Sequence, residues 1–285
     1  MIANILDGIV FGIQLGLWAA GLTLVYGLGG VLNLAHGQIA VISAMALAFS
    51  MDAGLPALPA AGLALVVGGL VGLFLDLTIL RPVYRLQGEA RVLLSLLLTL
   101  GVAFIVDGFL NWRYPGRTLS LFIGGGAIDI LGVPMRRGSL VASAITLVAF
   151  AALFSFFRFT VLGRAVRSVI EDVEGARLVG IDPGRILRLI LVLSGGLAAL
   201  VAVTRSMVVS VDVQAGFGIT VLALIVTVVG GLGSVSGAFL AGIILGIVNV
   251  IAADLIGTFM SLVILLLAAA VTILIRPAGL LGVEE

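Results

Sequence analysis

The sequence predicts an all-α membrane protein, a single bundle of about eight or nine transmembrane helices that occupies residues 1–285. Of its 285 residues, 62% are apolar and 10% are charged, and the mean hydropathy is +1.35. Soluble domains carry about a quarter charged residues to cover their surfaces. Apolar runs of about 20 residues, long enough to cross a hydrocarbon core of about 30 Å, recur along the whole chain. We therefore expect no separate soluble domain.

Nine apolar runs give the expected spans in order. No basic residue precedes the first run, so the charged start of a cleavable signal peptide is missing and we expect this run to be retained. Pro82, Pro277 and the stretch 55–59 are expected at loop edges, where proline removes a donor that would be unpaired anyway. The expected spans are 5–28, 34–51, 58–80, 92–110, 140–157, 187–208, a short one at 219–229, 238–253 and 258–275.

The distribution of arginine predicts which loops face the cytoplasm, because cytoplasmic loops hold an excess of basic residues near span ends. Nine arginines lie in the two loops that we assign to the cytoplasm: Arg81, Arg85, Arg91, Arg158, Arg164, Arg167, Arg177, Arg185 and Arg188. The loop 111–139 holds four, but long loops cross the membrane largely regardless of charge, so we expect it to be extracytoplasmic. The N-terminus is then extracytoplasmic, and the C-terminus, with Arg276, is cytoplasmic.

The residue types that the chain lacks exclude several kinds of chemistry. All 15 basic residues are Arg, there is no cysteine, and His36 is the one histidine. A phosphate-binding loop needs lysine, and an HExxH zinc site needs two histidines. A net charge of +1 predicts no attraction to nucleic acid. We expect no catalytic residue, metal or cofactor in this chain, so energy for uphill transport must come from another chain or an ion gradient.

The stretch 163–188 is the long polar segment on the predicted cytoplasmic side. Apolar residues at 166, 169, 170 and 173 recur at helical spacing with charges between them, which predicts a short helix lying across the bundle. We expect an ion pair between Arg167 and Glu171 at i,i+4, a left-handed cap at Gly180, and a new helix that Asp182 caps before Pro183. One interpretation is a solvated helix on the membrane surface. The other is a coupling helix seated on a cytoplasmic motor protein, with these contact residues: Arg167, Glu171, Asp172, Glu174, Gly175, Ala176, Arg177, Gly180 and Asp182.

Two glycine-rich stretches, 24–38 and 229–246, interrupt the apolar pattern. Glycine in membrane helices often serves close helix packing, which is one interpretation for Gly237, Gly242 and Gly246. The denser groups predict broken helices, and broken backbone at membrane depth is tolerated where it lines a cavity or is covered by protein. A lone histidine is more often structural than a ligand, but neutral polar groups here can also bind a solute. The predicted pathway residues are Asn33, His36, Gly37, Gln38, Gly230, Gly231, Gly233, Ser234 and Gly237.

Four motifs in this order resemble the permease family of branched-chain amino acid ABC importers: LVYGLGGVLNLAHGQ, the run from Glu174 to Gly180, GGLGSVSGAFLAG and RPAGLLG. The run Glu174-Gly175-Ala176 resembles the ATPase-contacting EAA-type loop, with glycine at its second position. The resemblance, closer to the shorter of the two permeases, implies a type II-like fold in a bacterial inner membrane. It also implies a second permease, an extracytoplasmic solute-binding protein, and two cytoplasmic ATPase subunits that carry ATP and magnesium.

The solute does not follow from the family, whose members carry branched-chain amino acids, urea, other amides and carboxylic solutes. An ion-coupled secondary transporter is the main alternative, since it also uses broken helices. Such a transporter needs ionisable groups inside the membrane. Four candidates fall near expected span ends, where interfacial water accommodates them: Asp76, Asp107, Arg205 and Asp254. A channel or an intramembrane enzyme has less support, because no filter sequence and no nucleophile with its base can be placed.

Overall fold

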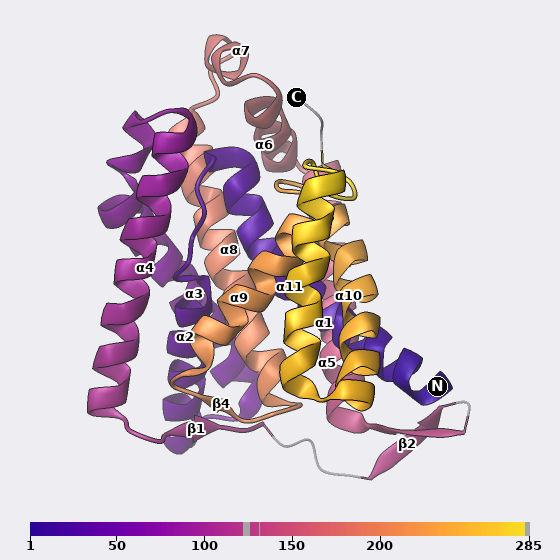
Figure 1. Ribbon diagram of the computed structural model, residues 1–285. Helices are drawn as coiled ribbons and strands as arrows, with labels where there is room; N and C mark the ends of the chain where they lie inside the picture. The colour runs from indigo at the N-terminus through magenta and orange to yellow at the C-terminus, as the bar shows by residue number, and fades with distance from the viewer. Residues whose placement is uncertain (122–125, 131, 283–285) are drawn as a thin grey trace.

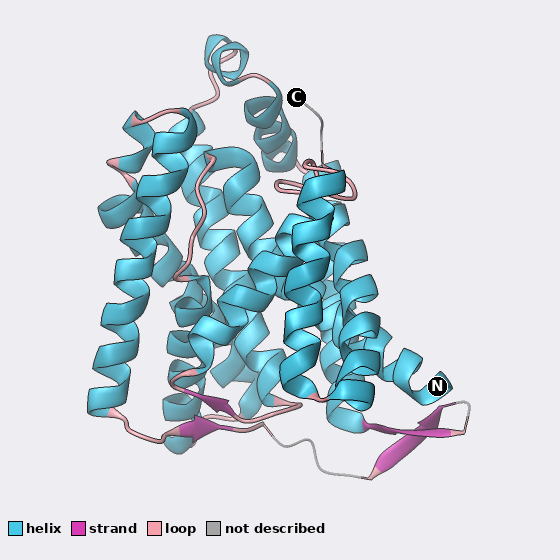
Figure 2. Cartoon of the chain, viewed as in Figure 1, coloured by secondary structure: helices cyan, strands magenta, loops and turns pink. Residues whose placement is uncertain are grey.

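The computed structural model describes residues 1–121, 126–130 and 132–282, and it shows a helical bundle (Figure 2). Within the described residues, seven helices are long and apolar enough to cross a membrane. These are α1 (Ile2–Gly29), α3 (Ala57–Leu75, continued by the π-helical turn η1, Asp76–Leu80), α4 (Gly88–Arg113), α5 (Arg137–Phe159), α8 (Pro183–Ser206), α10 (Val235–Ile256) and α11 (Thr258–Ile275). Two shorter apolar helices, α2 (His36–Asp52) and α9 (Ala215–Gly230), complete the set. All nine expected runs are helical, which confirms the predicted fold class.

The connections divide between two ends of the bundle (Figure 1). The turn η2 (Val83–Arg85), the helices α6 (Val161–Glu171) and α7 (Val173–Leu178), and the end of α11 lie at one end, here called the α7 side. The N-terminus and the short strands lie toward the opposite end, called the β1 side. The loops predicted to share a side therefore do share it.

Four short strands were not expected. β1 (Thr118–Leu119) pairs antiparallel with β4 (Val211–Asp212), and β2 (Ala127–Ile130) pairs with β3 (Val133–Arg136). The predicted loop 111–139 is shorter than expected, because α4 runs to Arg113 and α5 starts at Arg137. Residues 122–125 and 131 of that loop lie outside the described part of the chain.

The centre of the bundle is α1, which is almost wholly buried from Gly8 to Val25. A stripe of glycines on α1 faces a second stripe on α10. A Cβ atom placed on Gly12 would lie 2.6 Å from the Gly242 carbonyl oxygen and 2.6 Å from the Ile243 Cα atom. Without side chains between them, the two backbones approach closely, and van der Waals packing holds them together. Gly242 and Gly246 thus serve helix packing, the first of the two interpretations given to them.

This contact generates a stability prediction. Gly12→Ala should destabilise the fold by about 1–3 kcal/mol, because the added methyl group must push α10 away. The matched control is Gly62→Ala on α3, where a Cβ atom meets nothing within 4 Å among the described residues. That control should be neutral or gain up to about 1 kcal/mol from helix propensity. Thermal unfolding in detergent measures both variants, and equal midpoints would remove the α1–α10 contact as a determinant of stability.

Candidate functional site

The predicted coupling segment stands outside the bundle. Figure 1 shows α7 projecting beyond the ends of the other helices, with α6 beneath it. Thr160 caps α6 by accepting a hydrogen bond from the Gly163 N–H at 2.9 Å. Val166 and Val169 are buried against the bundle, and Arg167 is exposed. The segment therefore presents charge outward from a helix that is anchored by its apolar side.

The segment is two helices where one was expected. Asp172 is extended between α6 and α7, and its Oδ1 accepts a hydrogen bond from the Glu174 N–H at 3.0 Å, which caps α7. A Cβ atom on Gly175 would lie 3.0 Å from the Asp172 Cγ atom, so a larger residue there would have to shift the capping side chain. The predicted pair between Arg167 and Glu171 is not among the ion pairs of the described chain, because Arg167 donates to the Phe157 carbonyl at 2.6 Å.

The apolar face of the segment is also narrower than expected. The predicted face included Ile170 and Val173, but these side chains are 51% and 41% exposed. Leu178 and Val179, at the end of α7, are 89% and 74% exposed. Exposed apolar side chains of this size, rimmed by charge, are typical of protein interaction sites.

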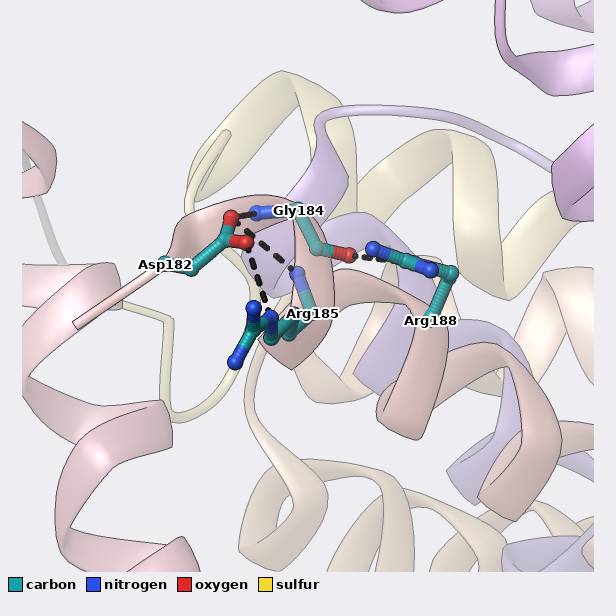
Figure 3. Close-up of polar contacts among 4 residues, drawn as sticks. All are labelled: Asp182, Gly184, Arg185 and Arg188. Atoms are coloured by element: carbon teal, nitrogen blue, oxygen red, sulfur yellow. Dashed lines mark hydrogen bonds and ion pairs between the residues drawn. The ribbon is translucent and has the colours of Figure 1, made fainter.

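A rigid turn joins α7 to α8, as predicted. Gly180 takes the left-handed conformation with φ +84°. Figure 3 shows the start of α8, where Asp182 Oδ1 accepts from the N–H groups of Gly184 and Arg185 at 2.9 and 3.4 Å. Asp182 Oδ2 lies 3.2 Å from Arg185 Nε, and Arg188 Nε donates to the Gly184 carbonyl at 3.3 Å. The turn leads directly into α8, which packs against α1, α2 and α3.

The first glycine-rich break is a re-entrant segment, residues 30–35. Figure 1 shows that the chain leaves the top of α1 and turns back into the bundle in an extended conformation. The helix α2 then begins inside the bundle. Thr99 accepts from the Leu34 N–H at 2.9 Å, and Ser95 accepts from the Leu32 N–H at 3.1 Å. Thr220 of α9 donates to the Leu34 carbonyl at 3.3 Å. Hydroxyl groups of neighbouring helices thus supply the hydrogen bonds that this backbone lacks.

Arg91, at the start of α4, holds the end of α1 beside this segment. Its guanidinium donates to three backbone carbonyls, those of Leu86 at 2.7 Å, Gly29 at 3.3 Å and Tyr84 at 3.5 Å. Carbonyls at a helix C-terminus lack intrahelical donors and carry partial negative charge, so an arginine there stabilises the end. The sequence showed Arg91 only as one more basic residue of a loop, because its partners lie in other elements.

The polar residues of the first break are buried and face different neighbours. Asn33, His36 and Gln38 are 1%, 0% and 1% exposed. The His36 ring packs against Gly21 of α1, and neither of its nitrogens has a hydrogen-bond partner in the described part of the chain. Gln38 points to α4 instead and donates to Asp107. The structure therefore does not gather these side chains into one cluster, and their place in a solute pathway stays a prediction.

The second glycine-rich break, between α9 and α10, lies on the α7 side and is covered by the backbone of residues 278–282. The Leu280 N–H donates to the Val229 carbonyl at 2.9 Å, and the Leu281 N–H donates to the Gly230 carbonyl at 3.1 Å. Ser234 caps α10 by accepting from the Gly237 N–H at 3.0 Å. The remaining glycines serve close contacts: Gly231 against residues 278–282, Gly233 against Gly27, and Gly237 against Gly230.

The chain is similar to known membrane transport proteins over most of its length. The family model described as "Branched-chain amino acid transport system / permease component" matches residues 4–275. The high-affinity branched-chain amino acid transport system permease protein LivH of Escherichia coli (strain K12) is 29% identical over 242 residues, which cover 79% of this chain and 77% of LivH. The corresponding protein BraD of Pseudomonas aeruginosa is 28% identical over 245 residues, which cover 80% of this chain and 78% of BraD.

A solved structure, "PsaBC from Streptococcus pneumoniae in complex with Fab", shares the fold with a TM-score of 0.53. It is 15% identical to this chain, and the match covers 98% of this chain and 97% of the solved one. At this identity the likeness concerns the fold. Within the described residues, no group of three or more His, Cys, Asp or Glu side chains could hold a metal ion.

The hydroxyls that serve the re-entrant segment can be tested by removal. Thr99→Val keeps the shape of the side chain but leaves the Leu34 N–H without its partner, and it should cost about 1–3 kcal/mol of unfolding free energy. The matched control is Thr272→Val on α11, where the hydroxyl bonds only the Ala268 carbonyl of its own helix. Denaturant titration in mixed micelles compares the two variants. A loss of stability no larger for Thr99→Val than for Thr272→Val would show that the segment does not depend on this bond.

Proposed function

The chain belongs to the permease component family of branched-chain amino acid transport systems and is a permease subunit of an ATP-binding cassette importer, and we propose what it transports. Its solutes in this proposal are branched-chain or related amino acids. The observation that carries the proposal is the family match over residues 4–275, which runs from α1 to the last residue of α11. The relatives that match most of the chain are named for branched-chain amino acid transport.

We propose that α6 and α7 form the surface that contacts the ATPase subunits. Three features support this. The segment projects from the bundle, it presents exposed charges such as Glu174 beside exposed Leu178 and Val179, and it joins α8 through the turn at Asp182. Glu174 pairs with Arg177 at 2.7 Å, and both side chains are more than half exposed. An exposed pair of this kind contributes at most about 1 kcal/mol to folding, so these charges are available to a partner.

In this mechanism, ATP-driven closure of two ATPase subunits pushes on α6 and α7, and the bundle alternates between outward-open and inward-open states. The ATPases must bind the two states with different free energy, because equal affinity shifts no population. Converting the equilibrium from 1:99 to 99:1 requires about 5.5 kcal/mol of differential binding. ATP and magnesium belong to the partner subunits, and this chain contributes no catalytic residue.

The same proposal fixes the orientation and the assembly. The α7 side faces the cytoplasm of a bacterial inner membrane, so the N-terminus is extracytoplasmic and the C-terminus is cytoplasmic. A solute-binding protein delivers solute on the β1 side, and a second permease subunit packs beside this one within the lipid bilayer. The large apolar side chains that α4 and α11 expose supply the surfaces for lipid and for that subunit.

The coupling surface is tested by reversing one charge. Glu174→Arg should reduce solute-stimulated ATP hydrolysis of the reconstituted complex at least tenfold, because it places a like charge beside Arg177 at the centre of the proposed contact. The control is Glu89→Arg, another exposed acidic residue, which lies in the first turn of α4 and outside α6 and α7. Thermal midpoints of both variants should match the unmodified protein. Full stimulation in Glu174→Arg would remove this residue from the coupling.

The solute class is tested by uptake into proteoliposomes that contain the whole importer. Leucine uptake should require ATP inside the vesicle and a solute-binding protein outside, and it should survive an uncoupler. Uptake of urea or of a carboxylic solute in place of leucine would move the protein to another solute class of its family. Leucine uptake driven by an ion gradient without ATP would instead identify a secondary transporter.

A further inference from the structure

The acidic residue Asp107 occupies an unusual place on α4. It lies six residues before Arg113 at the end of the helix, which is about 9 Å inside the span at 1.5 Å per residue. The buried stripe of α4 includes Ala103 and Leu110, and Asp107 is about 40° around the helix from Ala103. Its side chain is therefore at the edge of the seam between α4 and the bundle, away from the fully exposed face of α4 that carries Ile105 and Trp112.

The Asp107 carboxylate has few hydrogen-bond donors and no cation beside it in the described part of the chain. It forms none of the ion pairs there, and its side-chain contact is Gln38, whose Nε2 donates to Oδ1 and Oδ2 at 3.4 and 3.3 Å. Both distances are long for hydrogen bonds between nitrogen and oxygen. Gln38 is 1% exposed, and its Oε1 is buried with no partner among the described residues. The pair thus offers three acceptor oxygens and one amide NH2 group, whose two donor–acceptor distances are long.

An aspartate at the centre of a span costs about 2.5–3.5 kcal/mol on insertion scales. Asp107 lies nearer the end of α4 and costs less than this, but the buried, unpaired Oε1 atom of Gln38 beside it adds to the cost. What the Asp107 and Gln38 pair lacks is a positively charged donor. An ammonium group has three N–H donors and no acceptor, and its hydrogen bonds to a carboxylate are among the strong ones.

Two further amide side chains lie between the pair and the β1 side. Asn111, one turn further along α4, donates to the Asp107 carbonyl at 2.9 Å. Gln214, which precedes α9, donates to the Asn111 Oδ1 at 3.0 Å. Gly216 faces Gln38 with no side chain of its own, so α9 leaves the amide room. These two amide side chains lie on the β1 side of Asp107, the side on which the proposed solute-binding protein delivers solute.

We propose that Asp107 and Gln38 bind the α-ammonium group of a zwitterionic amino acid in the half of the pathway nearest the β1 side. This inference rests on the proposed function and deepens it, because it places a choice of solute class in this chain. Solutes without an ammonium group, such as urea or a simple carboxylate, gain nothing from these acceptors. The pair would therefore select amino acids in addition to the selection made by the solute-binding protein.

The test measures leucine binding and uptake by the purified importer. Asp107→Asn should weaken leucine binding to the permease complex at least tenfold and reduce uptake to the same degree, because the attractive charge is lost. Asp107→Glu keeps the charge and should stay within a few-fold of the unmodified complex. The matched control is Asp254→Asn on α10, where the carboxylate also accepts from an amide, that of Asn4 at 2.8 Å. It should change neither measurement more than twofold.

A further readout separates solute binding from a structural role. The des-amino analogue 4-methylpentanoate has no ammonium group, so the Asp107→Asn complex should bind it at least as tightly as the unmodified complex does. If the Asp107→Asn complex fails to assemble, the Gln38→Leu variant is tested in its place. Gln38→Leu should lose leucine binding, and Asp107→Glu should retain leucine binding. Unchanged leucine binding in the neutral variants would overturn the inference. Absence of leucine uptake by the unmodified importer would instead overturn the proposed function, so the two failures are distinguishable.

Discussion

The membrane interior holds no water, so every backbone polar group that leaves a helix there must find a partner in the protein. This constraint organises the structure around residues 30–35. The extended chain is acceptable at depth because Ser95 and Thr99 on α4 and Thr220 on α9 supply hydroxyl groups at hydrogen-bond distance. These bonds tie α2, α4 and α9 to one another, and they explain why α4 is attached to the bundle although most of its surface is exposed.

Hydropathy alone predicted the nine helices, because a span is defined by its own composition and length. Local capping signals were equally readable, and Asp182, Pro183 and Gly180 take the predicted positions. The errors concern contacts between distant residues. Arg167 was expected to pair within its helix, but it bonds a carbonyl of α5. The break at Asp172 was missed because the charged pattern continues through it. The strands were missed because two or four residues carry no periodic signal.

The candidate site was predictable to a similar extent. The density of glycine identified both interruptions of the helices, because few other residues tolerate a non-helical backbone conformation of this kind. It did not reveal that one break enters the bundle while the other is covered by residues 278–282. Asp107 was visible in the sequence as an acidic residue near a span end, where interfacial water accounts for it. Only the fold shows that Gln38, far away in sequence, faces it.

The packing of residues 278–282 over the junction of α9 and α10 also bears on the order in which the protein can fold during synthesis. The carbonyls of Val229 and Gly230 receive their hydrogen bonds from Leu280 and Leu281, about fifty residues later in the chain. Because Leu280 and Leu281 follow α11 in the chain, these two carbonyls receive their hydrogen bonds only after α11 has been synthesised. The junction between α9 and α10 therefore depends on residues 278–282, and an insertion before residue 282 would separate Leu280 and Leu281 from the carbonyls that they bind.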